Sequence, residues 1–163
     1  MESNVFIALG SNMGDRELNL LRAVAEIGKL PETRITALSG FYETEPVGPV
    51  PEQPDFLNAV LRIETSLTPH RLLEELQRIE TGLFGRRREV PQGPRSMDLD
   101  ILLYGSLTVA VEGLVIPHPR LHQRRFVLVP LAEIAPDMIH PVQEKPVREL
   151  LASLPPGERV TKI

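Results

Sequence analysis

The sequence predicts an α+β fold: a ferredoxin-like sandwich with a mainly antiparallel sheet, helices packed on one face of it, and long loops. Segments of strand and helix character follow the order β-α-β-β-α-β, which is the order of a split βαβ unit. Two segments interrupt it, because residues 45–54 contain four prolines and residues 85–94 contain three arginines, two prolines and two glycines. Long loops in a compact domain usually carry function, so we expect both to border a substrate site on the open sheet face.

The N-terminal half predicts a strand, a helix and two further strand segments. Residues 5–9 form a short apolar run that ends at a Gly-Ser-Asn turn, which is typical of a buried strand. Residues 15–27 carry apolar side chains at helical spacing, and Gly28 follows as a stop. Residues 34–44 have β-type composition, and residues 55–65 alternate with a period of two.

The alternation within residues 55–65 divides the side chains of this strand between two faces. The apolar face consists of Leu57, Ala59, Leu61 and Ile63. The mixed face consists of Phe56, Asn58, Val60, Arg62 and Glu64. An aromatic ring and an amide are therefore expected side by side on the mixed face.

The C-terminal half predicts a helix, a strand and two more helices. Thr68 is an N-cap residue, and Pro69 occupies the first position of the helix that it opens. Residues 96–104 predict a central strand, and its apolar side chains indicate burial. Residues 126–135 and residues 147–154 predict the two further helices.

Two aspartates stand at the start of the central strand. Side chains at i and i+2 of a strand point to the same face, so Asp98 and Asp100 should project together. Leu99, Ile101 and Leu103 then occupy the other, core-facing side. Neighbouring carboxylates repel each other unless a cation lies between them, and Mg²⁺ takes one or two carboxylates together with substrate phosphates. This pair predicts metal and anion chemistry, although an Asp-x-Asp pair alone also occurs as a turn cap or a surface ion pair.

Positive charge is concentrated around the two aspartates. Residues 86–125 carry seven arginines and four acidic residues, a net charge of +3, whereas the whole chain carries −4 and its remainder therefore −7. A basic segment in an acidic protein favours one local anion site over general binding of nucleic acid. Arg86, Arg87, Arg88 and Arg95 offer rigid donors for phosphate oxygens, with a solvated charge run as the alternative for the first three.

Composition limits the remaining possibilities. With 163 residues, 42% of them hydrophobic, the chain is expected to form a single domain over residues 1–163. It contains no cysteine, which suits a reducing compartment. No signal segment and no apolar run of membrane-spanning length are present, so we expect a cytoplasmic protein without a membrane partner. Nothing in the sequence requires more than a monomer.

Several residues have an ordinary structural role as their alternative. His118 alone would be a loop histidine, and Phe56 on a strand is more often a core residue than a stacking surface. Asn58 alone would satisfy a backbone group, and Arg124 with Phe126 would begin a helix with a solvated charge. Only the combination of these residues indicates a function.

In combination, these segments resemble 6-hydroxymethyl-7,8-dihydropterin pyrophosphokinase, a family of folate-pathway enzymes. The resemblance extends over residues 5–136, with the motifs in the same order and at similar spacing. The block Gly-Pro-Arg-x-x-Asp-Leu-Asp-Ile, with Pro-His-Pro-Arg downstream, is highly specific. The segments that carry the resemblance are residues 8–12, 41–44, 53–59, 93–100, 117–120 and 124–126.

The resemblance implies an ATP-dependent diphosphotransferase with long catalytic loops. Members transfer the βγ-pyrophosphoryl group of ATP to the hydroxymethyl oxygen of the reduced pterin and release AMP, a step in tetrahydrofolate biosynthesis. Asp98 and Asp100 match the ligands of two Mg²⁺ ions. Arg86 and Arg95 match arginines on a mobile loop that closes over the reaction centre. ATP and the pterin are thus the expected small-molecule partners.

The same resemblance assigns two groups of binding residues. Those that match nucleotide-binding positions are Gln77, Glu80, Arg88, Ile101, His118 and Arg124. Those that match the pterin pocket are Thr44, Pro46, Val47, Phe56, Asn58 and Phe126. A flat polar ring suits aromatic faces with donors and acceptors nearby, which the second group provides.

Three positions depart from the family pattern. Gln92 stands where many relatives carry tryptophan, which puts a closing aromatic contact in doubt. Phe56 replaces a frequent tyrosine and keeps the ring without its hydroxyl, and Pro119 occupies a site that is tyrosine in some relatives. None of these changes touches the expected metal ligands.

Two other functions stay open from the residues themselves. A nucleotidyltransferase also combines a Gly-Ser turn with Asp-x-Asp, but its two motifs lie close along the chain, whereas Ser11 and Asp98 are 87 residues apart. A ligand-binding module without catalysis would not need paired carboxylates that face an arginine loop. The by-product formed from ATP distinguishes the three functions.

Overall fold

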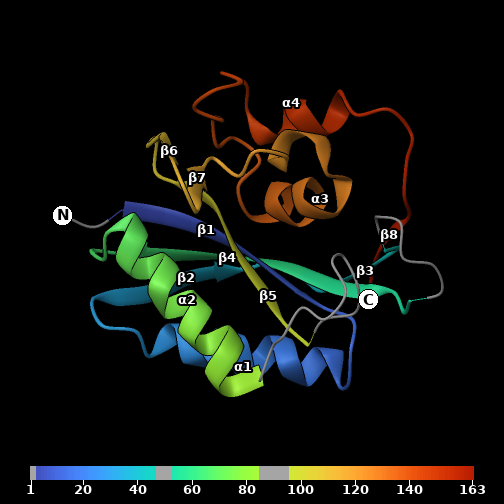
Figure 1. Cartoon of the computed structure of the whole chain (residues 1–163). Helices are drawn as coiled ribbons and strands as arrows, with labels where there is room; N and C mark the ends of the chain where they lie inside the picture. The colour runs from blue at the N-terminus through green and yellow to red at the C-terminus, as the bar shows by residue number, and fades with distance from the viewer. Residues whose placement is uncertain (1–2, 47–52, 85–95) are drawn as a thin grey trace.

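A mainly antiparallel sheet lies at the centre of the structure, a computed structural model that describes residues 3–46, 53–84 and 96–163. Its strands are β1 (Ser3–Ser11), β2 (Thr33–Leu38), β3 (Tyr42–Thr44), β4 (Phe56–Thr65), β5 (Asp98–Tyr104) and β8 (Val160–Lys162). β1 pairs antiparallel with β4 on one side and with β5 on the other (Figure 1). β2 and β3 pair with successive parts of β4, and β8 pairs with β3. The α+β class is confirmed.

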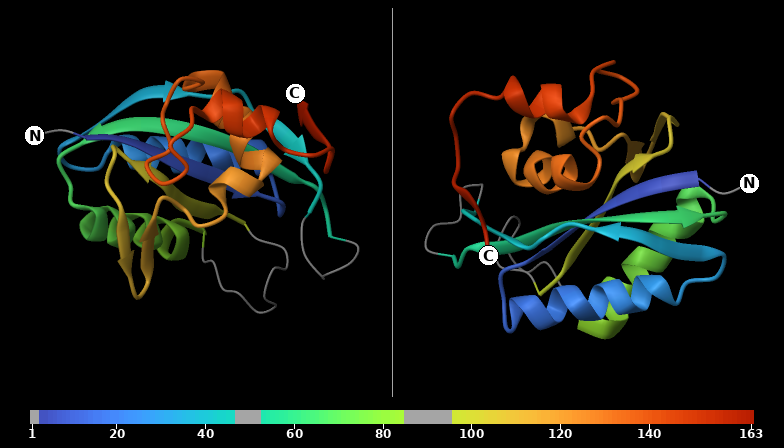
Figure 2. Two further views of the ribbon diagram at one scale, coloured as in Figure 1. Left: turned by 90° about the horizontal axis from the view of Figure 1, so that it is seen from above. Right: turned by 180° about the vertical axis from the view of Figure 1, so that it is seen from behind.

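Helices cover both faces of this sheet. α1 (Arg16–Gly28) and α2 (Pro69–Phe84) pack on one face, and α3 (Arg125–Ile134), with α4 (Val147–Ala152) beside it, covers the other (Figure 2). The prediction of helices on one face alone was therefore wrong. The reason is that the central strands carry apolar side chains on both sides, so each side needs a cover.

Two hydrophobic cores result from this arrangement. The first lies between the sheet and the helices α1 and α2, and the second lies beneath α3. The members of the first core that β4 supplies are Leu57, Ala59, Leu61 and Ile63. In the second core, Val60 of β4 packs with Phe6 of β1 and Leu128 of α3. The predicted division of β4 into two faces is confirmed.

β5 departs from the predicted alternation at its middle. Ile7 of β1 pairs with Ile101 and Phe6 pairs with Leu103, so β5 has one extra residue, Leu102, at this point. Such a β-bulge reverses the side-chain alternation beyond it. Leu103 consequently packs in the second core and Tyr104 in the first, which corrects the expectation that Leu103 shares a side with Ile101.

Local sequence signals locate the starts of the two longer helices. Asp15 Oδ1 accepts a hydrogen bond from the Leu18 N–H at 3.1 Å and caps α1. Thr68 Oγ1 accepts one from the Arg71 N–H at 3.2 Å before α2, which confirms the predicted N-cap. Both caps satisfy backbone donors that have no partner inside a helix.

Short elements between β5 and α3 were not predicted. β6 (Val109–Val111) and β7 (Leu114–Ile116) form a hairpin whose turn contains Gly113 at a φ of +84°, and a short 3₁₀ helix (Leu121–Gln123) follows. Strands of three residues are too short to show a hydrophobic period. No helix in the three described ranges combines the length and the apolar character needed to cross a bilayer.

Candidate functional site

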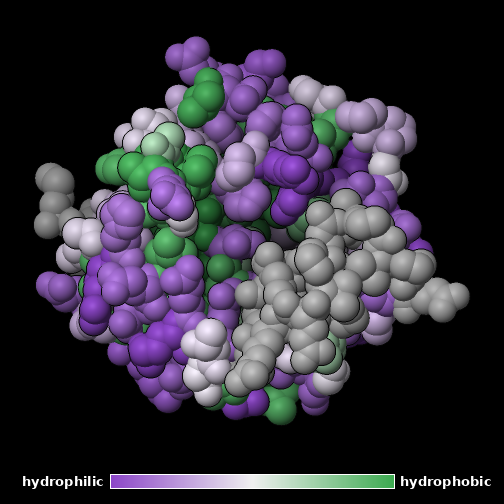
Figure 3. Space-filling view, in the orientation of Figure 1, coloured by the Kyte–Doolittle hydropathy of each residue, from purple (hydrophilic) through white to green (hydrophobic). Residues whose placement is uncertain are grey.

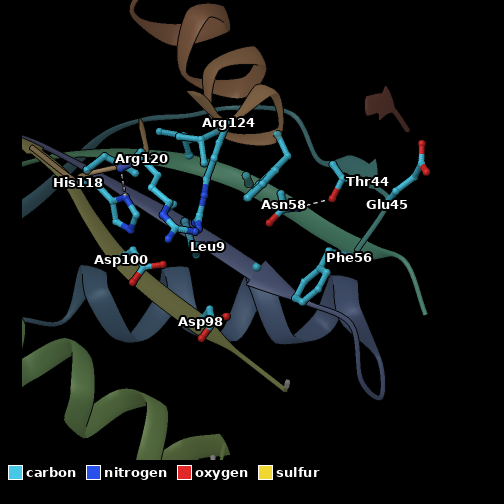
Figure 4. A pocket seen from close by; sticks show the side chains of 17 residues that line it. Leu9, Thr44, Glu45, Phe56, Asn58, Asp98, Asp100, His118, Arg120 and Arg124 are labelled. Atoms are coloured by element: carbon cyan, nitrogen blue, oxygen red, sulfur yellow. Dashed lines mark hydrogen bonds between the residues drawn. The ribbon is translucent and has the colours of Figure 1, made fainter. Parts of the chain in front are cut away.

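A cavity of about 240 Å³ lies on the α3 side of the sheet (Figure 4). Its floor consists of β1, β4 and β5, and its walls come from the end of β3, the segment after β7 and the start of α3. Eight residues expected in the site from the sequence line it: Thr44, Phe56, Asn58, Asp98, Asp100, His118, Arg124 and Phe126. Residues far apart in the sequence thus meet at one place.

The two aspartates of β5 both line the cavity. They pair across the sheet with the smallest residues of β1, since Asp98 lies opposite Gly10 and Asp100 opposite Ala8. Small neighbours leave open space around the carboxylates. Asp98 is partly buried and Asp100 is exposed, so both carboxylates are placed to meet a ligand that enters the cavity.

Three residues expected near the nucleotide lie on the opposite side of the sheet floor or away from it. Glu80 on α2 is buried, and its Oε2 accepts a hydrogen bond from the Leu99 N–H at 2.7 Å. Ile101 is buried in the first core, and Gln77 is exposed on α2. None of the three is among the residues that line the cavity. Glu80 instead holds the backbone of β5 between the two aspartates.

A cationic wall faces the aspartates. The His118 N–H donates to the Leu102 carbonyl at 2.9 Å, which ties the segment after β7 to β5. Burial lowers the pKa of His118, Asp100 raises it, and the charges of Arg124 and Arg120 lower it further. Arg124 lies with its guanidinium carbon 5.5 Å from the centre of the Phe126 ring. Positive groups therefore gather opposite the carboxylates, as binding of a polyanion requires.

Arg120 is a cavity residue that the sequence reasoning missed. Its side chain extends from the same wall as Arg124 toward the floor near Leu9 (Figure 4). Its backbone N–H donates to His118 Nδ1 at 3.3 Å. The signal was present, because Arg120 is the last residue of the Pro-His-Pro-Arg motif.

The far end of the cavity has an aromatic and amide character. Phe56 and Asn58 extend from the same side of β4, as their alternation predicted (Figure 4). Asn58 Nδ2 donates to Thr44 Oγ1 at 2.6 Å, and Thr44 is buried. Phe126 supplies a second ring from α3. Glu45 was not expected here but also lines this end, whereas Pro46 does not.

Several expected site residues lie outside the described residues. The arginines expected on the catalytic loop and at the nucleotide are Arg86, Arg88 and Arg95. Val47 of the expected pterin pocket and Gln92 also fall there. Their roles stay predictions.

The fold and the cavity first define a class: an α+β enzyme in which a carboxylate pair faces arginines beside an aromatic pocket, the arrangement of a phosphoryl-group transferase. Residues 6–136 match the family model of 7,8-dihydro-6-hydroxymethylpterin-pyrophosphokinase (HPPK). The chain belongs to this family.

Curated relatives agree with the family match. The chain is 51% identical over 134 residues to a 2-amino-4-hydroxy-6-hydroxymethyldihydropteridine pyrophosphokinase of Bacillus subtilis, an alignment that covers 82% of this chain and 79% of the relative. It is 46% identical over 160 residues to the protein of the same name from Methylorubrum extorquens, covering 97% of this chain and 99% of the relative. At this identity and coverage, the likeness extends well beyond the motifs.

Solved structures share the fold. A crystal structure of HPPK-DHPS in complex with substrates matches with a TM-score of 0.73 at 15% identity, over 94% of this chain and 43% of that chain. A Plasmodium falciparum HPPK-DHPS structure matches with a TM-score of 0.72, over 93% of this chain and 42% of that chain. The present chain therefore spans less than half of these solved chains, and the likeness concerns the fold alone.

Proposed function

We propose that this protein transfers the βγ-pyrophosphoryl group of ATP to the hydroxymethyl oxygen of 6-hydroxymethyl-7,8-dihydropterin, with AMP as the by-product. The observation that carries this proposal is the convergence, in one cavity of an HPPK-family chain, of a carboxylate pair, a cationic wall and an aromatic-amide pocket. The product is the pterin diphosphate, an intermediate of folate synthesis.

The cationic wall binds the triphosphate. His118, Arg120 and Arg124 present their side chains to the same space, and guanidinium groups pair with phosphate oxygens in a fixed geometry. The charge of the two arginines offsets that of the triphosphate, so a neutral hydroxyl can approach the β-phosphorus. Arg86, Arg88 and Arg95 add to this charge in our proposal, on the basis of the family resemblance alone.

Asp98 and Asp100 suit magnesium. Mg²⁺ usually binds one or two carboxylates together with substrate phosphates and water. The described residues contain no group of three or more His, Cys, Asp or Glu side chains that could hold a metal ion. The protein's share of ligands is thus a carboxylate pair, which fits an ion that is brought with the nucleotide. Two Mg²⁺ ions held there would neutralise phosphate charge and polarise the phosphorus.

The aromatic-amide end binds the pterin. Phe56 and Phe126 offer ring faces to the flat bicyclic substrate. The Asn58 amide, fixed by its hydrogen bond to Thr44, offers polar atoms to the edge of the ring. Backbone groups of Pro46 and Val47 complete this edge in our proposal. The substrate hydroxymethyl group then points toward the carboxylate pair.

The reaction itself depends on position and charge. The hydroxymethyl oxygen attacks the β-phosphorus in line, and the bond between this phosphorus and the oxygen that bridges it to the α-phosphate breaks. The bridging oxygen leaves with AMP, and the hydroxyl proton is released to water. In phosphoryl transfer, the protein mainly orients the reactants and stabilises the charge of the transition state. The fixed walls of the cavity perform the first task, and its cationic side chains perform the second.

The by-product of the reaction tests this function. The protein is incubated with Mg²⁺, ATP and 6-hydroxymethyl-7,8-dihydropterin, and the nucleotide products are separated. We expect AMP and the pterin diphosphate in equal amounts. Pyrophosphate would instead indicate a nucleotidyltransferase, ADP an ordinary kinase, and unchanged ATP a binding module; each of these results contradicts the proposal.

The domain extent, oligomeric state, location and partners of the enzyme are proposed from the sequence. We propose that residues 1–163 form one catalytic domain that acts as a monomer in the cytoplasm. Its partners are the two small-molecule substrates, with no nucleic acid and no membrane among them.

A further inference from the structure

A second cavity lies behind the cationic wall. It has a volume of about 320 Å³ and is lined by the β6–β7 hairpin, the segment that follows it and the residues His140, Val142 and Gln143. Of the residues that the structure describes, only His118 lines both this cavity and the catalytic one. Its volume falls within the range of small-molecule sites.

Histidines and apolar side chains line this cavity. The chain has four histidines, and three of them, His118, His122 and His140, contribute to its lining. Most of the remaining surface comes from valine, isoleucine, alanine and proline, and none of the described lining residues is acidic. The valines at its edge, Val115 and Val142, are 46% and 59% exposed, so the cavity is accessible from solvent. In the space-filling view, hydrophobic side chains gather over the β6–β7 hairpin (Figure 3).

The proton of His140 has a defined position. The N–H groups of Val142 and Gln143 donate to its Nδ1 at 3.1 and 3.0 Å. A nitrogen that accepts hydrogen bonds carries no proton, so the proton of the neutral ring is on Nε2. Burial and the neighbouring His122 lower the pKa of His140, which favours this neutral form.

The Nε2–H group of His140 lacks an acceptor. The side chain is 3% exposed, and Nε2 is a buried polar atom without a hydrogen-bond partner among the described residues. A buried donor in this state costs free energy that a suitable acceptor would recover. His122 packs against this ring with 5.8 Å between the ring centres and an angle of 76° between the planes. His122 itself is only partly buried.

This tautomer decides which ligands the cavity suits. A metal ion would need the lone pair of Nε2, which the proton occupies, so His140 is not placed to act as a metal ligand. His118 accepts the Arg120 N–H on Nδ1 in the same way. The cavity thus offers the N–H donor of His140 within an apolar surround, which favours an oxygen acceptor on an apolar molecule.

We propose that this cavity is a second ligand site, which takes a small apolar molecule whose carbonyl or carboxylate oxygen accepts the hydrogen bond of His140 Nε2–H. Because Nε2 is buried, the oxygen reaches it when the ring of His122, which packs on His140, moves aside. The apolar body then lies against Val115, Pro119 and Val142. Because His118 separates the two cavities, a molecule bound here also changes the affinity for the nucleotide.

The wild-type protein provides the first test, without nucleotide. Its imidazole nitrogens are labelled with ¹⁵N, and NMR spectra are recorded during titration with benzamide, benzoate and toluene. We expect a protonated Nε2 on His140 that shifts with benzamide or benzoate, and not with toluene. The two binding probes separate a carbonyl from a carboxylate preference. A proton on Nδ1, or equal responses to all three probes, or no response at His140, overturns the proposal.

Two variants and one control provide the second test. His140→Asn keeps an acceptor for the Val142 and Gln143 N–H groups but removes Nε2–H, so probe affinity should fall about tenfold. His122→Ala removes the ring that packs against His140 and should raise probe affinity. His70→Asn, at an exposed position of α2, should leave it unchanged. Unchanged affinity in both cavity variants overturns the site.

The link to the nucleotide is measured with a non-hydrolysable ATP analogue. The dissociation constant of the ATP analogue should change about fivefold or more when benzamide or benzoate, whichever binds, saturates the second cavity. Equal constants with and without the probe overturn the link. Since these measurements need no turnover, their failure leaves the proposed pyrophosphokinase activity standing, and failure of that activity leaves the second site testable.

Discussion

Gly10 and Asn58 lie directly opposite each other on β1 and β4, and a Cβ atom at position 10 would stand 2.7 Å from Asn58 Oδ1. That distance is shorter than van der Waals contact permits. The Asn58 amide therefore needs a glycine beside it in order to keep its hydrogen bond to Thr44. A glycine near the end of β1 is in this way a requirement of the cavity end that we propose for the pterin.

Gly10→Ala is expected to weaken pterin binding selectively. The added methyl group displaces the Asn58 amide, so the KM for the pterin should rise about fivefold to tenfold, as for the loss of one hydrogen bond. The KM for ATP should change much less. Steady-state kinetics with each substrate varied in turn provide the measurement.

Gly82→Ala is the matched control. A Cβ there meets no atom within 4 Å, and the residue lies on the exposed side of α2. We expect unchanged KM values and a gain of about 0.5–1 kcal/mol in the free energy of unfolding, from the higher helix propensity of alanine. Equal KM changes for both substrates in Gly10→Ala would contradict the role given to Asn58.

Asp98→Asn should abolish most of the turnover while the protein stays folded. The substitution keeps the shape of the side chain but removes the charge that suits it to magnesium, which is worth several kcal/mol in such sites. A fall in kcat of about 10²-fold to 10³-fold follows. Asp137→Asn, which breaks an exposed ion pair with Arg148, serves as the control and should keep normal activity. Near-normal kcat in Asp98→Asn over a range of Mg²⁺ concentrations would exclude the metal assignment.

Alternation and capping predicted much of the fold. The faces of β4 followed from a period of two, because each side of that strand meets a different core. Thr68, an N-cap residue followed by proline, predicted the start of α2. The bulge in β5 did not follow, because the number of residues opposite each other is a property of the partner strand β1. Leu103 was therefore assigned to the wrong side.

Sequence reasoning predicted which site side chains lie together where both residues of a pair belong to the same strand. Asp98 with Asp100, and Phe56 with Asn58, lie two apart on β5 and β4 and line the same cavity. Glu80, which the resemblance assigns to the nucleotide, comes from α2 and accepts a hydrogen bond from the backbone of β5. Position along a helix does not reveal which side of a sheet that helix covers. Residues from different elements therefore needed the tertiary structure.

Glu80 should act as a positioning residue. Glu80→Ala leaves the Leu99 N–H buried without its acceptor, so the free energy of unfolding should fall by about 1–3 kcal/mol. The Mg²⁺ concentration for half-maximal activity should also rise, because the strand that carries both aspartates loses its anchor. Glu80→Gln keeps an acceptor oxygen and should recover most of both effects. Glu74→Ala, at an exposed position of the same helix, should show neither. A stability loss without a changed Mg²⁺ requirement would make Glu80 merely structural.

Arg120 should bind phosphate. Arg120→Gln is expected to raise the dissociation constant of an ATP analogue about threefold to tenfold at low salt, with little change for the pterin. Since Arg120 is exposed, added salt should reduce this difference. Arg125→Gln removes a charge from the same segment, but Arg125 does not line the cavity and donates to the Pro155 carbonyl at 3.0 Å. Equal effects of the two substitutions would indicate a general charge effect in place of a contact.

A carboxylate and a phenol connect α3 to the edge of the sheet. The Tyr42 hydroxyl donates to Glu133 Oε1, and the Gly40 N–H lies 3.1 Å from each carboxylate oxygen. Burial alone would raise the pKa of Glu133, but the hydrogen bonds from Tyr42 and Gly40 and the charge of Lys162 outweigh it and lower the pKa. Burial, the hydrogen bond and the charge of Glu133 raise the pKa of Tyr42 from 10.0 to about 12.

These two shifts predict opposite pH limits for the same contact. A carboxyl group with a lowered pKa in the folded state stabilises the protein above its unfolded pKa and loses this effect as the pH falls through the folded pKa. A phenol with a raised pKa stabilises below about pH 10 and loses the effect as the pH rises toward about 12. Urea unfolding should show that Glu133→Gln is less stable than wild type near neutral pH, by a margin that shrinks in acid. Tyr42→Phe should likewise be less stable near neutral pH, and its deficit should shrink above about pH 10. A deficit that stays constant over both ranges would show that the contact contributes by packing and not by charge.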